Sequence, residues 1–121
     1  KWALNNRTPI DTWSSGRVTL LGDAVHPTLP YMAQGAAMAI EDAAVFTRCL
    51  QQESDVEKAL LLYQNNRKDR TRDIVNRSTE HGHLYHLSSA EEFQKAFEGR
   101  DLGADRAQWL YSYDPLTVPL N

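Results

Sequence analysis

The chain has 121 residues, a hydrophobic fraction of 41%, a charged fraction of 24% and a formal net charge of −3. These values are ordinary for one small globular domain and argue against nucleic acid or an anionic membrane as a partner. No apolar run reaches the length of a membrane span. Cys49 is the single cysteine and has no internal partner, which favours a reducing compartment, the cytoplasm.

The first part of the chain predicts short strands and a loop. Residues 1–5 are compatible with a short strand. Residues 17–21 form a short apolar run between two glycines, which predicts a buried strand. A loop over residues 24–34 follows, and Pro27 and Pro30 stiffen it.

Residues 35–50 predict a helix that is apolar almost all round and therefore buried. At about 100° per residue, Glu41, Arg48 and Gln52 form one narrow polar stripe. Asp42 falls on the apolar side, where a carboxylate is costly unless it has a partner. We therefore expect Asp42 to be a buried, paired structural carboxylate rather than an acid catalyst.

The second half of the chain predicts further helices. Asp55 is placed to cap a helix that runs to about Thr79. Residues 67–77 of that helix carry five basic and two acidic side chains, which predicts a solvated face with the helix pairs Asp69–Arg72 and Asp73–Arg77. A capping-box pattern at residues 88–92 starts a third helix that ends near residue 99. The aromatic tail, residues 109–115, is expected to pack against the rest of the chain.

These elements do not make a complete domain. A buried strand needs neighbouring strands at its edges and layers on its faces, and the chain offers at most one other short strand. The sequence also does not begin with Met. We expect a mostly α fragment with one or two short strands, in which residues 1–121 form a single C-terminal segment of a larger protein.

The strand, loop and helix over residues 17–50 have the order of a ligand site in an open α/β sheet, where ligands bind beyond the carboxyl ends of the strands. Gly22 and Asp23 lie at that end of the predicted strand. Asp23 can accept hydrogen bonds from two hydroxyl groups, as a sugar or ribityl chain would supply. The first N–H groups of the helix at Gly35 favour a negative group, and a glycine there permits close approach.

The run of residues 16–27 (GRVTLLGDAVHP) and 30–43 (PYMAQGAAMAIEDA) closely resembles the second flavin-binding motif of the class A flavoprotein monooxygenases. Within that family it is most similar to the salicylate hydroxylase and 6-hydroxynicotinate 3-monooxygenase group. The family's Gly-x-Gly-x-x-Gly segment, which holds the ADP part of FAD, does not occur in this sequence. The resemblance therefore implies the C-terminal segment of a two-domain α/β flavin-monooxygenase fold, with a flavin motif at 17–50, a helical remainder at 55–121 and a missing N-terminal FAD-binding portion.

The resemblance also implies roles for single residues. Gly22 and Asp23 would bind FAD, with Asp23 on the ribityl hydroxyls. Gly35, Ala36 and Ala37 would form the helix N-terminus that faces the pyrimidine edge of the flavin. Pro30 would be the wall beside the substrate ring.

The activity implied is that of an FAD-dependent monooxygenase, an oxidoreductase that uses NAD(P)H and O2 to hydroxylate a small aromatic acid. One alternative is a relative that uses the same flavin scaffold for epoxidation or halogenation. A second alternative is a non-enzymatic helical interaction module. The isolated chain is expected to be inactive, to bind FAD poorly and to self-associate through its uncovered apolar surface.

Several other positions are weaker candidates for the site. His26 is a candidate catalytic base or substrate contact, but a loop histidine that only forms hydrogen bonds is the simpler interpretation. Tyr31 is a candidate for the substrate pocket wall or for packing. Arg7 is a candidate residue near the pocket. The histidines at 81, 83 and 86 resemble metal ligands, but without Cys, Asp or Glu at matching spacing we expect a surface cluster and no metal.

Overall fold

The computed structural model describes residues 3–98 and 104–121. Its elements in chain order are the strands β1 (Ser14–Ser15) and β2 (Val18–Thr19), the 3-10 turns η1 (Gly22–Ala24) and η2 (Pro30–Met32), and the helices α1 (Gly35–Gln52), α2 (Val56–Leu84), α3 (Ala90–Phe97) and α4 (Ala104–Tyr111). The expectation of a mostly helical chain with short strands is confirmed.

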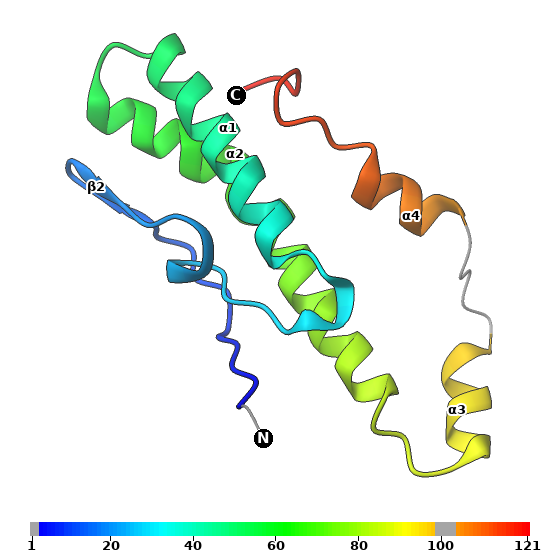
Figure 1. Ribbon diagram of the computed structural model, residues 1–121. Helices are drawn as coiled ribbons and strands as arrows, with labels where there is room; N and C mark the ends of the chain where they lie inside the picture. Colours follow the sequence, from blue (N-terminus) through cyan, green and yellow to red (C-terminus); the bar gives the residue numbers. More distant parts are fainter. Residues whose placement is uncertain (1–2, 99–103) are drawn as a thin grey trace.

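An antiparallel pair of helices, α1 and α2, forms the centre of the molecule (Figure 1). The side chain of Asp55 accepts a hydrogen bond from the backbone N–H of Lys58, so the predicted N-terminal cap of α2 is confirmed. The helix continues beyond the expected end at Thr79 as far as Leu84. It passes through Gly82, because tertiary packing stabilises the last turns despite the low helix propensity of glycine.

One face of α1 packs against α2 and the opposite face is exposed. The buried residues Met38, Asp42, Val45 and Cys49 follow the spacing of a single helix face. On the other side Ile40 is 70% exposed. The helix is therefore not wholly buried in this chain, because the described residues cover only one side of α1. This agrees with the uncovered apolar surface that the sequence predicts for the isolated segment.

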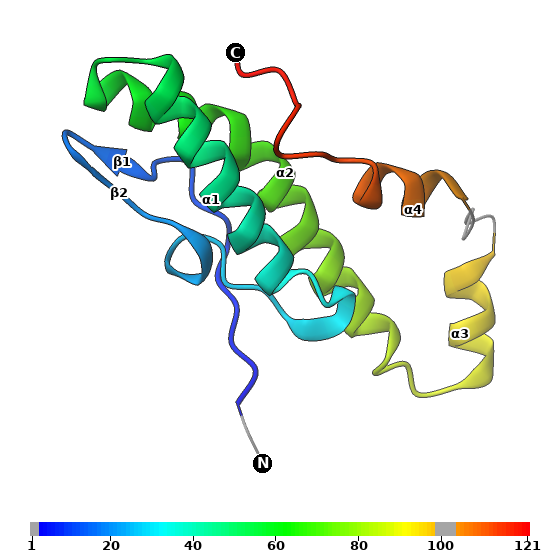
Figure 2. The same cartoon turned by 45° about the horizontal axis from the view of Figure 1, so that its top comes forward.

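Two clusters of buried side chains hold the helices together. The first contains Trp13, Val25, Val45, Cys49 and Tyr63, and joins the N-terminal segment to both central helices. The second contains Met38, Ile74, Val75 and Leu110, and joins the C-terminal tail to the same pair. Figure 2 shows the hairpin of β1 and β2 on one side of the helix pair and the tail after α4 on the other.

The strand predicted at residues 17–21 is shorter and more exposed than expected. Only Val18 and Thr19 are in a strand, and they pair with β1 as an antiparallel hairpin. Val18 is 69% exposed, and Leu20 and Leu21 are each 37% exposed. The described residues 3–5 form no strand. A two-stranded hairpin has no further strand or layer to bury these side chains. They are therefore exposed in this chain, which lacks the neighbouring strands that a buried strand needs.

The basic stretch at residues 67–77 is not simply a solvated face. The side chain of Arg67 is 0% exposed and that of Arg70 is 9% exposed. Both lie where α2 is covered by α1 and the tail, a tertiary arrangement that the charge pattern alone did not reveal. The predicted pair Asp69–Arg72 is formed at 3.1 Å, whereas Arg77 lies 4.6 Å from the ring centroid of Trp109 instead of pairing with Asp73.

The C-terminal elements follow their local signals. The hydroxyl of Ser89 accepts the N–H of Glu92 and caps α3, as the capping-box pattern predicts. Leu110 in α4 is 7% exposed, so the expectation that the aromatic tail packs against the chain is confirmed. None of the described helices combines the length and the apolar character of a membrane span.

Candidate functional site

An open groove of about 500 Å³ lies where the loop after β2 meets the start of α1. Its lining brings together four residues that the sequence assigned to a ligand site, Asp23, Pro30, Gly35 and Ala36. Thr28, Ala33 and Ala39 complete it. The η1 and η2 turns carry Asp23 and Pro30, so residues from two turns and one helix N-terminus converge on the same space.

The N-terminus of α1 is free to receive a ligand. No side chain caps this helix in the described structure. Its first N–H groups, at Gly35, Ala36 and Ala37, precede the intrahelical pattern, which begins with the Met38 N–H donating to the Gln34 carbonyl at 2.8 Å. These donors and the helix dipole favour a negative group or a hydrogen-bond acceptor in the groove.

Gly22 supports the groove from behind. It is buried and adopts φ +61, a left-handed conformation that favours glycine. Its carbonyl accepts the N–H groups of Val25 and His26, each at 3.0 Å, which closes the tight turn that presents Asp23. A Cβ at Gly22 would also lie 3.4 Å from the Cβ of Ala39. The glycine is therefore required by the turn and permits the close approach of the turn to α1.

Asp42 holds this turn in place from α1. Its Oδ2 accepts the N–H of Gly22 at 3.0 Å and lies 2.6 Å from Nε2 of His26, while its Oδ1 accepts Nε of Arg67 at 2.7 Å. Asp42 is 0% exposed. Burial acts to raise the pKa of Asp42, but the hydrogen bond to His26 and the charge of Arg67 outweigh it and hold the pKa below its ordinary value. The expectation of a buried, paired structural carboxylate is confirmed.

Arg67 is the central cation of this buried network. Its guanidinium also pairs with Glu41 at 2.8 Å, and Glu41 binds Arg70 through two hydrogen bonds of 2.7 and 2.8 Å. Burial acts to lower the pKa of Arg67, but the neighbouring Asp42 carboxylate outweighs it, so the pKa lies above its ordinary value. The network links both central helices to the η1 turn.

His26 and Ala37 are placed outside the lining of the groove. His26 is 2% exposed, its Nε2 faces Asp42, and its ring centroid lies 5.8 Å from that of Trp13. Its Nδ1 is buried without a hydrogen-bond partner among the described residues. Ala37 is half-buried in the first turn of α1 and contributes its backbone there. The imidazole of His26 thus contacts Asp42 beneath the η1 turn and does not face the groove.

Tyr31 and Arg7 are also outside the groove lining. The ring of Tyr31 stacks on Tyr85 with 5.5 Å between centroids, so it packs against α2. Arg7 donates to the carbonyls of Ala24 and Val25 at 2.8 and 3.0 Å and so tethers the loop that follows Asp23. Both residues support the loop from outside.

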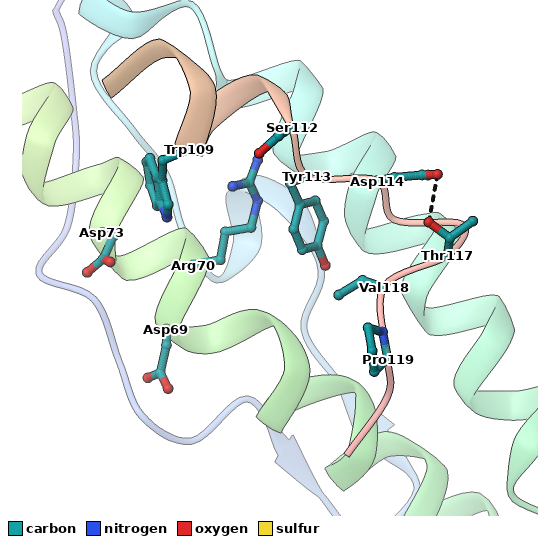
Figure 3. A pocket seen from close by; sticks show the side chains of 10 residues that line it. All are labelled: Asp69, Arg70, Asp73, Trp109, Ser112, Tyr113, Asp114, Thr117, Val118 and Pro119. Carbon is teal, nitrogen blue, oxygen red and sulfur yellow. Dashed lines mark hydrogen bonds between the residues drawn. The ribbon is translucent and has the colours of Figure 1, made fainter. Parts of the chain in front are cut away.

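A second hollow of about 560 Å³ lies between α2 and the C-terminal tail (Figure 3). Figure 3 shows Arg70 between the rings of Trp109 and Tyr113, and its guanidinium carbon lies 5.4 and 4.0 Å from their centroids. Arg70 already binds both oxygens of Glu41 and the carbonyl of Leu110. This hollow is larger than the groove. However, the guanidinium of Arg70 is already bound to Glu41 and Leu110, so we interpret the hollow as a packing gap rather than a ligand site.

The sequence predicted the residues that line the groove better than the buried residues that support it. The position of Asp42 off the polar stripe signalled that it needs a partner. Nothing in the local pattern distinguished Arg67 from the other basic residues of α2, because the choice depends on which helix face meets α1. Among the described residues, no group of three or more His, Cys, Asp or Glu side chains is arranged to hold a metal ion.

Comparison with known sequences gives one family for most of the chain. Residues 1–78 match the family described as FAD binding domain. A 3-hydroxybenzoate 6-hydroxylase of Polaromonas naphthalenivorans (strain CJ2) is 44% identical over 119 residues, which cover 94% of this chain and 30% of that protein. A 6-hydroxynicotinate 3-monooxygenase of Pseudomonas fluorescens is 40% identical over 122 residues, which cover 99% of this chain and 27% of that protein.

A solved structure has the same arrangement of elements. The salicylate hydroxylase substrate complex matches with a TM-score of 0.75 and 30% sequence identity over 94% of this chain and 29% of that one. The chain thus spans less than a third of the length of these relatives. The similarity confirms the expected fold class, a segment of a flavin-monooxygenase fold.

Proposed function

Because this chain belongs to the FAD-binding family of aromatic-ring monooxygenases, we propose that it is the flavin-proximal segment of an enzyme that hydroxylates a small aromatic acid with NAD(P)H and O2. The observation that carries the proposal is the groove that joins Asp23, Pro30, Gly35 and Ala36 at an uncapped helix N-terminus. Three matched relatives are, by their names, a hydroxybenzoate hydroxylase, a hydroxynicotinate monooxygenase and a salicylate hydroxylase. All three names refer to small aromatic acids.

The residues of the groove fit the ribityl and pyrimidine parts of FAD. The side chain of Asp23 is exposed and lines the groove. It makes no hydrogen bond or ion pair with the other described residues, so its carboxylate is available to accept hydroxyl hydrogen bonds. A Cβ at Gly35 would meet only Thr28 Cγ2, at 3.6 Å, so the open space above Gly35 belongs to the groove. The N–H groups of Gly35, Ala36 and Ala37 would face the acceptor edge of the flavin ring.

Bound FAD would supply the redox chemistry that the side chains of this segment lack. The task of this chain's residues is then to hold and orient the cofactor. Gly22 and Asp23 would position its ribityl chain, and Pro30 would form the wall beside the aromatic substrate. In this proposal the catalytic role considered for His26 becomes a positioning role, because the ring is 2% exposed and its Nε2 lies 2.6 Å from Asp42.

The remaining parts of the site would come from outside this segment. We propose that residues 17–50 form the flavin-contacting unit and residues 55–121 its helical scaffold. An N-terminal FAD-binding portion would hold the ADP part of the cofactor and cover the apolar side of the hairpin and of α1, where Val18 and Ile40 are exposed. An uncovered face of this kind would otherwise favour self-association of the isolated segment.

We assign the protein to the cytoplasm. Cys49 is free, 0% exposed and surrounded by the apolar core of the central helix pair. Burial raises the pKa of its thiol, which disfavours the reactive thiolate. A reduced structural thiol of this kind is compatible with a reducing compartment.

A substrate screen of the full-length protein tests the proposal. Purified holoprotein is expected to oxidise NAD(P)H faster in the presence of a hydroxybenzoate, salicylate or hydroxynicotinate, and to release the hydroxylated product. Product analysis separates hydroxylation from oxidation that is merely stimulated. Activity on alkenes or with halide, and none on any aromatic acid, would contradict the proposed reaction while leaving FAD binding in place.

A further inference from the structure

The C-terminal part of α2 contacts residues 29–32, the loop that carries Pro30 and forms one wall of the groove. Figure 2 shows the cyan turn of residues 30–32 against the yellow-green part of α2. The hydroxyl of Ser78 donates to the carbonyl of Leu29 at 2.6 Å. Ser78 and Gly82 are four positions apart and lie on one face of α2, and Tyr85 follows at the C-terminal cap of the helix.

Gly82 lies directly against the ring of Tyr31. A Cβ built at Gly82 would lie 2.5 Å from Cε2 and 2.9 Å from Cδ2 of Tyr31. Such distances do not occur in folded proteins, so the ring of Tyr31 occupies the space that a side chain at position 82 would need. The ring is held further by Tyr85, which stacks on it at an interplanar angle of 21°. The contact therefore exists only because position 82 is glycine.

Gly82 is an unfavourable residue for the interior of a helix. Glycine in a helix interior is less favourable than alanine by roughly 1 kcal/mol. Gly82 nonetheless lies inside α2, two residues before its end at Leu84, and is buried. The helix continues through it, and the ring of Tyr31 fills the space beside it.

The two sides of the groove are thus anchored separately. The Asp23 side is fixed through Gly22 by Asp42. The Pro30 side has no link to that carboxylate among the described contacts and is held through its chain neighbours, Leu29 and Tyr31, by α2. A disturbance at Gly82 should therefore move the Pro30 wall and leave the Asp23 side in place.

We propose that Gly82 and Tyr31 are positioning residues that set the Pro30 wall of the groove and thereby determine which aromatic substrate fits. The inference rests on the proposed function, which assigns that wall to the substrate and the Asp23 side to the flavin. Neither residue needs to touch the substrate. Tyr31, considered from sequence as a pocket wall, acts in this assignment through Pro30.

The test compares Gly82→Ala, Tyr31→Ala and the double variant in the full-length holoprotein. In Gly82→Ala the added methyl forces the Tyr31 ring and Pro30 to move, so KM for the best aromatic acid is expected to rise about tenfold. The dissociation constant for FAD should change less than about twofold, a difference near the precision of such titrations. Asn76→Ala, at an exposed position of the same helix, is the control and should leave both constants unchanged.

The double variant separates this packing from a general effect on the helix. Without the ring, alanine at position 82 only improves helix propensity, so Gly82→Ala should raise the melting temperature in the Tyr31→Ala background and lower it in the parent. If Gly82→Ala alone fails to fold, recovery of soluble protein in the double variant carries the same information.

The outcomes distinguish this inference from the proposed function. An unchanged KM in Gly82→Ala, a loss of FAD affinity as large as the rise in KM, or the same sign of the melting-temperature change in both backgrounds would overturn the positioning role. If the parent shows no activity on any aromatic acid, the proposed function fails. The role of Gly82 and Tyr31 in substrate selection then fails with it. The melting temperatures still test whether glycine is needed at position 82 to make room for the ring of Tyr31.

Discussion

The backbone N–H of Gly22 donates to the carboxylate of Asp42 at 3.0 Å, across 20 positions of sequence. This contact ties the left-handed turn that presents Asp23 to the middle of α1. The same carboxylate binds Arg67 of α2, so one buried anion connects the groove to the central helix pair. Because a buried charge is stable only with its partners in place, the geometry of the turn depends on the whole network.

Replacement of Asp23 by alanine is expected to weaken FAD binding by the full-length protein without unfolding it. The side chain is exposed at the groove, so the fold does not depend on it. Each hydrogen bond lost from a charged acceptor costs about 1.5–3 kcal/mol, which corresponds to roughly 10–100-fold in the dissociation constant. Flavin titration measures this change, with Glu57→Ala in the first turn of α2 as an exposed acidic control. Equal dissociation constants for Asp23→Ala and the parent would remove Asp23 from the flavin site.

Replacement of Asp42 by alanine is expected to destabilise the fold strongly. It leaves the buried guanidinium of Arg67 without its closest partner and removes the acceptor of the Gly22 N–H. Removing one member of a buried ion pair costs about 3–5 kcal/mol. Urea unfolding of the full-length protein, followed through the helical signal, measures the loss. Asp69→Ala removes a carboxylate of an exposed pair and should cost less than about 1 kcal/mol; similar losses for the two variants would contradict the structural role of Asp42.

Stability should decline in acid because of the same carboxylate. The pKa of Asp42 in the folded chain lies below the ordinary value of 3.8, since His26 and Arg67 together outweigh the effect of burial. Its contribution is therefore complete above about pH 4 and is lost as the pH falls through the lowered pKa. Melting temperatures recorded from about pH 7 to pH 3 should fall at the acid end in the parent and more shallowly in Asp42→Asn. If the melting temperatures of the two proteins fell equally with decreasing pH, another titrating group would be responsible for the loss of stability in acid.

The isolated 121-residue chain is expected to self-associate, to bind FAD weakly and to have no activity. Val18, Ile40 and Leu50 are 69%, 70% and 42% exposed, and covering apolar surface contributes about 25 cal/mol per Å². Light scattering combined with flavin fluorescence measures both properties. Ile40→Glu places a charge on the exposed face of α1 and should reduce association, while Glu57→Ala should not. A monomer that binds FAD at micromolar concentration would contradict this expectation.

Local signals in the sequence determined the helices and the residues of the groove. The cap at Asp55 and the capping box at Ser89 act within one helical turn, so they are visible without the fold. The order of strand, turn and helix placed Asp23 after the C-terminal end of the strand and Gly35 at the N-terminal end of the helix, and the groove contains both. The resemblance of residues 16–43 to a flavin motif suggested the cofactor, because this part of such a site lies within one continuous stretch of chain.

Burial of Asp42 was predicted from its place on the helix, but only the tertiary structure decided which arginines are buried and which partners support the groove. In sequence, nothing distinguishes Arg67 and Arg70 from the less buried basic residues around them. Their burial follows from the contact of α2 with α1 and the tail. The pairing of Asp42 with Gly22 and the fit of Tyr31 against Gly82 join segments far apart in the chain. Such contacts depend on the relative position of whole elements, which packing sets and which no local pattern encodes.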